Sequence, residues 1–235
     1  MSEHTHKQFD AELDDLRMHV TKMGGLVEEQ VRNAIKAFCE GDRDLVEQVI
    51  AQDATVDKQE LDIDEACARV IALRQPAATD LRLVMAIGKT VTDLERIGDD
   101  AKKIAKATRK ILERGVRGSA DQVVDIRSMG EQATRMLHDV LDALVRLDAN
   151  DAANIVRRDK EINQHFQSIL RQLVTYMMED PRTITTALDV MFAAKSIERI
   201  GDHSKNIAKD VIYVVKGRDV RHMGASDFDR EMETK

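Results

Sequence analysis

The chain has 235 residues, of which 43% are hydrophobic and only 3% are aromatic, and it contains two prolines. This length can bury a sizeable core, and the shortage of proline and aromatic residues favours helices over a sandwich or barrel, so we predict an all-α fold. The formal net charge of −7 argues against direct, general binding of nucleic acid.

The cysteines and the N-terminal sequence indicate the cellular compartment of the protein. Cys39 and Cys67 are too few, and too plainly set in helical patterns, for a disulfide framework. The N-terminus lacks the apolar core of a signal peptide, and no apolar run approaches the ~20 residues that span a bilayer. We therefore expect a cytoplasmic protein that meets a membrane only through its partners.

The first half of the chain predicts a flexible start followed by three helices. Residues 1–7 are polar, and we expect a flexible N-terminus there. Gly41 ends the first helix, and Pro76 separates the second from the third. The 3.6-residue period of the apolar residues places the helices over about 9–39, 45–73 and 77–112. Residues 8–114 should therefore form one antiparallel three-helix bundle.

The second half repeats this pattern. Residues 115–118, flanked by two glycines, are the predicted domain junction. Residues 119–217 should form a second bundle, because the same features return at an offset of about 105 residues. Its helices are predicted over about 121–147, 152–178 and 182–216. Residues 218–235 are charged and aperiodic, and we expect a polar, irregular tail. The chain thus reads as two tandem, internally duplicated antiparallel three-helix bundles.

The sequence Glu-Arg-Ile-Gly-Asp occurs once in each half, at 95–99 and at 198–202. Its two carboxylates are four residues apart, a spacing that stacks them on one face of a helix. Its glycine weakens a helix interior by ~1 kcal/mol relative to alanine, which indicates a close approach of helices or a crowded site.

Two further polar residues are predicted to face each motif from the preceding helix. Counted back from the turn at Pro76, Asp53 and Asp57 lie level with the first motif. Counted back from Asp180-Pro181, Asp159 and the amide Asn163 lie level with the second. Carboxylates brought this close repel one another, and hard oxygen ligands suit a divalent or trivalent cation. We therefore predict one metal site per repeat, with the ligands Asp53, Asp57, Glu95 and Asp99 in the first and Asp159, Glu198 and Asp202 in the second.

Other interpretations of these acids stay open. Acidic pairs at this spacing are common on solvated helix faces, where Lys102 and Lys205 could balance them as ordinary ion pairs. A di-iron carboxylate enzyme is a second possibility, although such bundles typically use Glu-x-x-His, which the motif lacks. A metal-free helical adaptor is a third. No phosphate-binding glycine loop or activated nucleophile is found, so no catalytic residue is predicted.

These features together resemble the PhoU family of phosphate-transport regulatory proteins. The resemblance covers residues 8 to 217 approximately. It rests on the doubled Asp/Ser-x-Glu-Arg-Ile-Gly-Asp-x-x-x-x-Ile-Ala pattern, on Gln75-Pro76-x-x-x-Asp80-Leu81-Arg82 and on a Met-Gly pair early in each half. The family resemblance implies two similar three-helix bundles, and carboxylate motifs that hold iron, zinc, manganese or magnesium. The sequence departs from the pattern at Asn163, so we expect the second half to hold the smaller share of metal.

The resemblance also implies a function without catalysis. Members of this family restrain phosphate uptake and the transcriptional response to phosphate starvation. They do so by contacting the ATPase subunit of the phosphate ABC transporter and a membrane sensor histidine kinase. We accordingly expect a negative regulator of phosphate homeostasis that binds these two partners, and we expect a homodimer.

Overall fold

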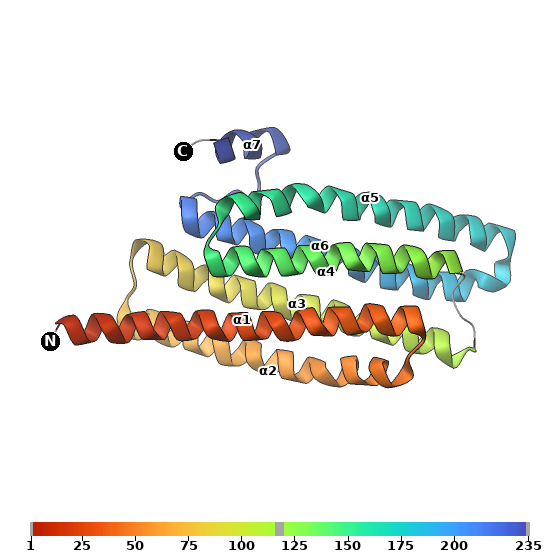
Figure 1. The fold of residues 1–235 in the computed structure, drawn as a ribbon, viewed down its shortest axis with the longest axis horizontal. Coiled ribbons are helices and arrows are strands. Elements are labelled where there is room, and N and C mark those ends of the chain that lie inside the picture. The colour runs from red at the N-terminus through yellow and green to blue at the C-terminus, as the bar shows by residue number, and fades with distance from the viewer. Residues whose placement is uncertain (1, 116–119, 234–235) are drawn as a thin grey trace.

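The structure, a computed structural model, describes residues 2–115 and 120–233 (Figure 1). These residues contain helices and no strand, so the all-α prediction is confirmed. The helices are α1 Ser2–Glu40, α2 Arg43–Arg74, α3 Ala78–Glu113, α4 Ala120–Arg146, α5 Ala149–Glu179, the short 3-10 helix η1 Pro181–Thr183, α6 Ile184–Lys216 and α7 Ala225–Glu233.

The first three helices form one antiparallel bundle, and α4, α5 and α6 form a second (Figure 1). The bundles lie against each other through α3 and α6, which pack side by side, and through α1 and α4. One continuous hydrophobic core therefore runs through both repeats. None of the described helices has the combination of length and apolarity needed to cross a bilayer.

The Met-Gly pair of each repeat makes the contact between α1 and α4 possible. A Cβ on Gly24 of α1 would lie 2.6 Å from Leu141 of α4, and a Cβ on Gly130 of α4 would lie 2.7 Å from Ile35 of α1. The two contacts are reciprocal, because Gly130 and Leu141 occupy in the second repeat the positions of Gly24 and Ile35 in the first. The repeats are thus related by an approximate two-fold arrangement that depends on these small residues.

Both turns that open the middle helices use an aspartate cap. Asp42 accepts a hydrogen bond from the backbone N–H of Leu45 at 3.0 Å, and Asp148 accepts from those of Asn150 and Asp151 at 2.9 and 3.0 Å. These bonds satisfy N–H groups that have no partner within the helix. The caps fix where α2 and α5 begin, and hence which of their residues face α3 and α6.

The chain ends differ from the sequence-based expectation. Residues 2–7 are helical and continue α1. The tail expected to be irregular over 218–235 contains α7, and Val220 and Phe228 are buried against the second bundle. The ammonium of Lys216 donates to two carbonyls of α7 at 3.1 Å, which holds the short helix in place. One buried aromatic ring among charged residues gives too weak a periodic signal to be read from sequence. The predicted junction at 115–118 lies mostly outside the described residues.

Candidate functional site

The glycine of each motif lets its helix approach the preceding one closely, as the sequence predicted. A Cβ on Gly98 would lie 3.1 Å from Gln30 Oε1 and 3.3 Å from Val56. A Cβ on Gly201 would lie 3.0 Å from Ile162. Since α2 and α5 lie this near to α3 and α6, the acids of facing helices come within reach of shared partners.

In the first repeat, a lysine lies between the acids of the two helices. Asp53 on α2 is only 3% exposed, and its carboxylate accepts a hydrogen bond from the ammonium of Lys102 on α3. The same ammonium lies 3.9 Å from Asp99 Oδ1. The hydrogen bond to Asp53 raises the pKa of Lys102 and thus keeps it charged. Asp53 and Asp99 therefore share a level in the bundle, and they meet across an ammonium group.

Within residues 2–115 and 120–233, neither of the other two predicted ligands, Asp57 and Glu95, forms an ion pair with a lysine or arginine. Burial, followed by the charges of Asp53 and Asp99, raises the pKa of Asp57. Burial, followed by the charge of Asp99, likewise raises the pKa of Glu95, with Glu60 contributing next. A raised carboxyl pKa means that the anion is disfavoured by its surroundings. The facing sides of α2 and α3 thus bring several carboxylates together, and burial and mutual repulsion oppose the charge on Asp57 and Glu95.

Sequence reasoning missed two members of this acidic cluster. Burial and the charge of Asp64 raise the pKa of Glu60, which in turn acts on Glu95. Glu60 and Asp64 continue the face of Asp57 at helical spacing, so a count of acids along α2 beyond the level of the motif would have found them.

In the second repeat, a lysine bridges the acids more closely. Lys205 Nζ lies 2.6 Å from Asp159 Oδ2 and 3.0 Å from Asp202 Oδ1. Burial opposes the charge on Lys205, but the hydrogen bonds that its ammonium donates to both carboxylates outweigh this effect and raise the pKa of Lys205. Asn163 Nδ2 also donates to Asp159 Oδ2, at 3.1 Å. The carboxylate of Asp159 is thus held by two donors.

The third acid of the second repeat is also neutralised. Glu198 is 9% exposed and accepts a hydrogen bond from Lys195, whose ammonium lies 5.3 Å above the ring of Phe166. Further along α6, burial and the charge of Lys205 lower the pKa of Lys209. Each acid predicted as a ligand in this repeat therefore has a lysine as a partner.

The structure does not arrange the predicted ligands as a metal site. Within residues 2–115 and 120–233, no group of three or more His, Cys, Asp and Glu side chains is placed so that it could hold a metal ion. The donors of the first repeat fit a hard cation chemically, because they are carboxylate oxygens that repel one another. The donors of the second repeat fit less well, because Lys205 and Lys195 already supply the positive charge.

A second polar cluster, not predicted from sequence, lies between the repeats. Asp100 of α3 is fully buried and accepts hydrogen bonds from Arg199 of α6 at 3.0 Å and from Lys103 at 2.9 Å. His203 of α6 has its Nδ1 2.8 Å from Asp93 Oδ1 of α3. These contacts join α3 to α6, so the residues bind the repeats together. Their pairing depends on the packing of two distant helices, which no local motif reveals.

Comparison with known proteins gives a consistent result. The family model described as PhoU domain matches residues 20–108 and 126–211, one match in each repeat. The chain is 50% identical over 230 residues to the phosphate-specific transport system accessory protein PhoU of Edwardsiella tarda, covering 98% of this chain and 93% of that protein. It is 48% identical over 230 residues to the protein of the same name from Escherichia coli K12, covering 98% and 94%.

Solved structures agree with the sequence comparison. The crystal structure of PhoU from Pseudomonas aeruginosa superposes with a TM-score of 0.86 at 47% identity, covering 89% of this chain and 100% of that chain. The phosphate transport system regulatory protein PhoU from Streptococcus pneumoniae superposes with a TM-score of 0.83 at 30% identity, covering 90% and 99%. The duplicated bundle is thus similar over nearly the whole length of both structures.

Proposed function

The chain belongs to the PhoU family, and on this premise we propose that it is an accessory protein of a phosphate-specific transport system that restrains phosphate uptake and the phosphate-starvation response. The observation that carries the proposal is the identity of about half of all residues to PhoU of Edwardsiella tarda across 98% of the chain. The names of the relatives describe accessory proteins and no reaction, so the proposal includes no catalytic step.

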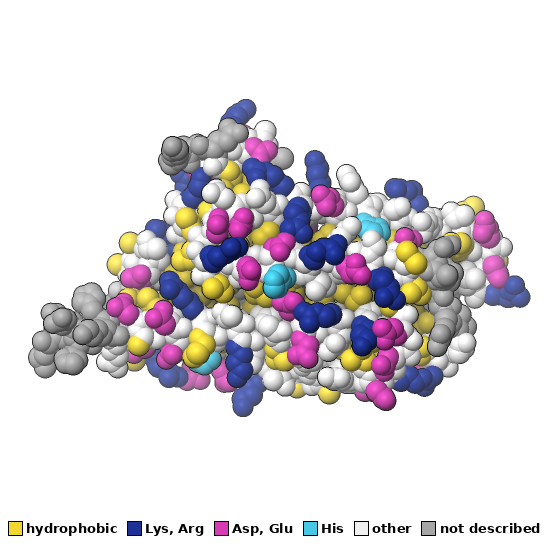
Figure 2. All heavy atoms as spheres, viewed as in Figure 1, with side chains coloured by type: hydrophobic (Ala, Val, Ile, Leu, Met, Phe, Trp, Pro, Cys, Tyr) yellow, Lys and Arg dark blue, Asp and Glu magenta, His cyan; other side chains and the backbone are white. Residues whose placement is uncertain are grey.

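The proposed partners are the ATPase subunit of the phosphate ABC transporter and the membrane sensor histidine kinase. Long helices offer extended faces to such partners. Figure 2 shows hydrophobic side chains along the seam between the bundles, bordered by charged side chains of both signs. Met18 and Val145, from α1 and α4, are 58% and 59% exposed beside a shallow hollow on this seam. The protein would act in the cytoplasm and as a homodimer, reaching the membrane through its partners.

Replacement of the relative in a living cell tests the regulatory role. The chain is expressed in Escherichia coli that lacks its own PhoU, and both phosphate uptake and a phosphate-starvation reporter are measured in phosphate-rich medium. We expect the reporter and the uptake to fall to the level given by the native protein. A reporter that stays at the empty-vector level, with the chain present in soluble form, would argue against the proposal.

Binding to each partner is tested separately with purified proteins. The chain is immobilised, and the ATPase subunit and the cytoplasmic part of the kinase are passed over it. Met18→Asp and Val145→Asp place a charge on the apolar seam and should weaken a partner that docks there, whereas Val174→Asp alters a similarly exposed apolar residue on α5 and serves as the control. Light scattering of the same samples gives the oligomeric state.

We propose further that the acidic cluster of the first repeat, between α2 and α3, binds a divalent or trivalent metal ion. Asp53, Asp57, Glu95 and Asp99 would supply its ligands, and Lys102 would have to turn away from Asp53. The support is the burial of these acids together with their like-charged neighbours, which raise the pKa of Asp57 and Glu95. A bound ion would neutralise this charge and offer a positive centre to phosphate or to an acidic partner surface. The second repeat, with Asp159, Glu198 and Asp202, would be the weaker site.

A di-iron enzyme is less well supported by the geometry. Such bundles typically use Glu-x-x-His, which neither copy of the motif contains, and the acids of the second repeat already pair with lysines. Oxygen consumption by the iron-loaded protein would distinguish this alternative, and absence of metal after reloading would leave the metal-free adaptor.

A further inference from the structure

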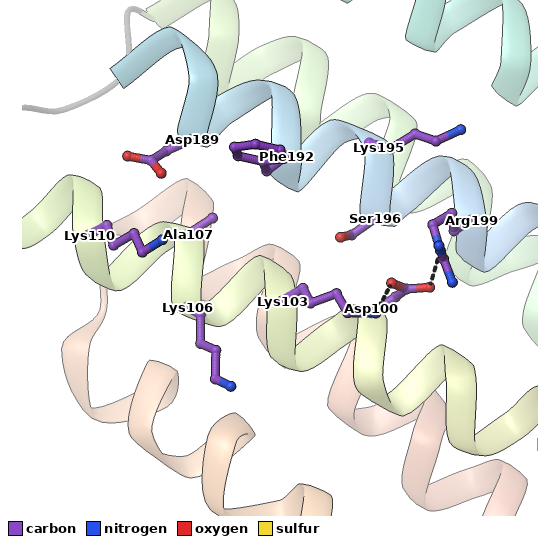
Figure 3. Close-up of a pocket in the computed structure, with 10 residues that line it drawn as sticks. All are labelled: Asp100, Lys103, Lys106, Ala107, Lys110, Asp189, Phe192, Lys195, Ser196 and Arg199. Carbon is purple, nitrogen blue, oxygen red and sulfur yellow. Dashed lines mark hydrogen bonds and ion pairs between the residues drawn. The ribbon is translucent and has the colours of Figure 1, made fainter. Parts of the chain in front are cut away.

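A groove between α3 and α6 concentrates positive charge on a protein whose net charge is −7. It encloses about 360 Å³, within the size range of small-ligand pockets. Five cationic side chains and two carboxylates line it, together with an exposed aromatic ring and small residues (Figure 3). The cations are Lys103, Lys106, Lys110, Lys195 and Arg199.

Both carboxylates of the groove are already engaged. Asp100 is buried and holds Lys103 and Arg199 by hydrogen bonds (Figure 3). Asp189 pairs with Arg114, which lies at the end of α3. In contrast, no carboxylate of the described residues forms an ion pair with Lys106 or Lys110. The groove therefore keeps uncompensated positive charge, which an anion could neutralise.

The positions of the cations favour an extended anion. Lys103, Lys106 and Lys110 follow one another at spacings of three and four residues, so they share a face of α3 and extend over ~10 Å along it. Lys110 extends along the groove toward Ala107, whereas the ammonium of Lys106 points outward on its flexible stem (Figure 3). Charges spread along a line suit several linked phosphoryl groups better than one orthophosphate ion.

An aromatic ring completes the groove. Phe192 of α6 is 59% exposed and lies between Asp189 and Lys195 on the α6 side of the groove (Figure 3). The face of this ring is therefore open to a flat ligand that enters the groove. Stacking of a nucleobase on an exposed ring, next to cations that hold phosphates, is a common mode of nucleotide recognition.

We propose that this groove binds a nucleoside polyphosphate, with the lysines of α3 on the phosphates and Phe192 stacked on the base. The site is separate from the proposed metal site, because none of the predicted metal ligands lines it. It also does not depend on the proposed regulatory partners. Lys195 connects the groove to the second motif, since it pairs with Glu198.

Titration calorimetry with three probes tests the proposal on the full chain. ATP, tripolyphosphate and adenosine are each titrated in the presence of a chelator, so that metal binding cannot contribute. We expect ATP to bind more tightly than tripolyphosphate, and adenosine to bind much more weakly than either. Lys106→Ala/Lys110→Ala should weaken ATP and tripolyphosphate by at least about tenfold, because two charge-assisted contacts are lost.

Two further variants separate the parts of the site. Phe192→Ala should weaken ATP by about tenfold and leave tripolyphosphate unchanged, whereas Phe192→Tyr should keep ATP binding. Lys36→Ala/Lys160→Ala replaces exposed lysines of α1 and α5. It removes the same charge elsewhere and should have little effect on ATP binding.

The proposal is overturned if ATP does not bind, if the two double-lysine variants behave alike, or if Phe192→Ala has no effect on ATP binding. Equal affinity for ATP and tripolyphosphate would also overturn it, since the base would then contribute nothing.

Discussion

The two repeats share the frame of the motif but differ in its charge. Asp99 and Lys102 in the first repeat correspond to Asp202 and Lys205 in the second, and each lysine meets an aspartate of the neighbouring helix. Around this common core, the first repeat gathers further acids and the second gathers lysines. The two repeats thus share the residues that join two helices. The surroundings differ, because acids predominate in the first repeat whereas lysines balance the acids in the second.

Three substitutions account for most of the difference. Where the first repeat has Asp57 and Glu60 on α2, the second has Asn163 and Phe166 on α5. On α6, Lys195 stands where α3 has Thr92, and its ammonium neutralises Glu198. A motif of five identical residues can therefore belong to two sites of different electrostatics, because the opposing helix decides which charges surround it.

The largest effect should come from a buried acid that only the second repeat carries. Asp210 lies where the first repeat has Ala107; it is 4% exposed, and burial raises its pKa to about 6 despite Lys89 at 3.7 Å. Because the folded pKa lies above the unfolded value of 3.8, the folded state binds the proton more tightly. Stability should therefore fall as pH rises from about 4 to beyond 6. Asp210→Asn should remove this slope and raise the free energy of unfolding at pH 7 by about 2 to 3 kcal/mol.

Urea unfolding of the wild-type protein and Asp210→Asn at a series of pH values checks this. Lys89→Met is the complementary variant, since it removes the cation that favours the charged form of Asp210 and should steepen the same slope. Parallel pH profiles of the wild type and Asp210→Asn would contradict the assignment.

The next effect concerns the bridging lysines. Lys205→Met leaves two carboxylates, Asp159 and Asp202, without their closest cation, and Lys102→Met removes that of the buried Asp53. Breaking a fully buried pair costs about 3 to 5 kcal/mol, and partial exposure of both lysines reduces this to about 2 kcal/mol for Lys205→Met and somewhat less for Lys102→Met. Chemical denaturation at pH 7 measures both.

Removal of both partners provides the internal control. Lys102→Met/Asp53→Asn removes both charges of the buried pair, so it should cost less stability than Lys102→Met alone. An equal loss in the two variants would show that the lysine stem acts only by packing.

The fold could be predicted from sequence more fully than the site. The 3.6-residue period, Gly41 and Pro76 indicate helices and their ends locally, and the duplication indicates two equal bundles. That Asp53 lies at the same height in the bundle as Asp99 could also be predicted, because helix geometry is regular. The position of Lys102 between them could not be predicted, since a long side chain has many rotamers and the facing helices decide which one it adopts. The clusters around Asp100 and Asp210 escaped prediction for the same reason: they form between the repeats.

Metal content gives the third comparison. Glu95→Ala/Asp99→Ala should remove the larger share of metal after chelation and reloading, and Glu198→Ala/Asp202→Ala the smaller share, because lysines already neutralise the second set. Removal of two carboxylate ligands should weaken the affected site by at least about tenfold, or ~1.4 kcal/mol. Elemental analysis measures the amount bound per chain. If the wild type and both variants hold the same trace of metal, the acids act instead as a charged docking face.

The smallest effect should follow from making the second repeat resemble the first. Asn163→Asp places a carboxylate 3.1 Å from that of Asp159, in the position that Asp57 holds in the first repeat. The new like-charge contact should lower the free energy of unfolding by about 1 kcal/mol at pH 7, since Lys205 remains nearby to offset part of the repulsion. Metal should reverse the loss, because one more oxygen ligand raises the affinity of the second site.

Asp57→Asn is the matched change in the first repeat and should do the opposite, stabilising the metal-free protein while weakening its metal binding. Thermal unfolding measures the midpoint temperature of each variant, once with and once without added Mn²⁺. If Mn²⁺ shifts neither variant relative to the wild type, charge balance alone, without metal binding, distinguishes the two repeats.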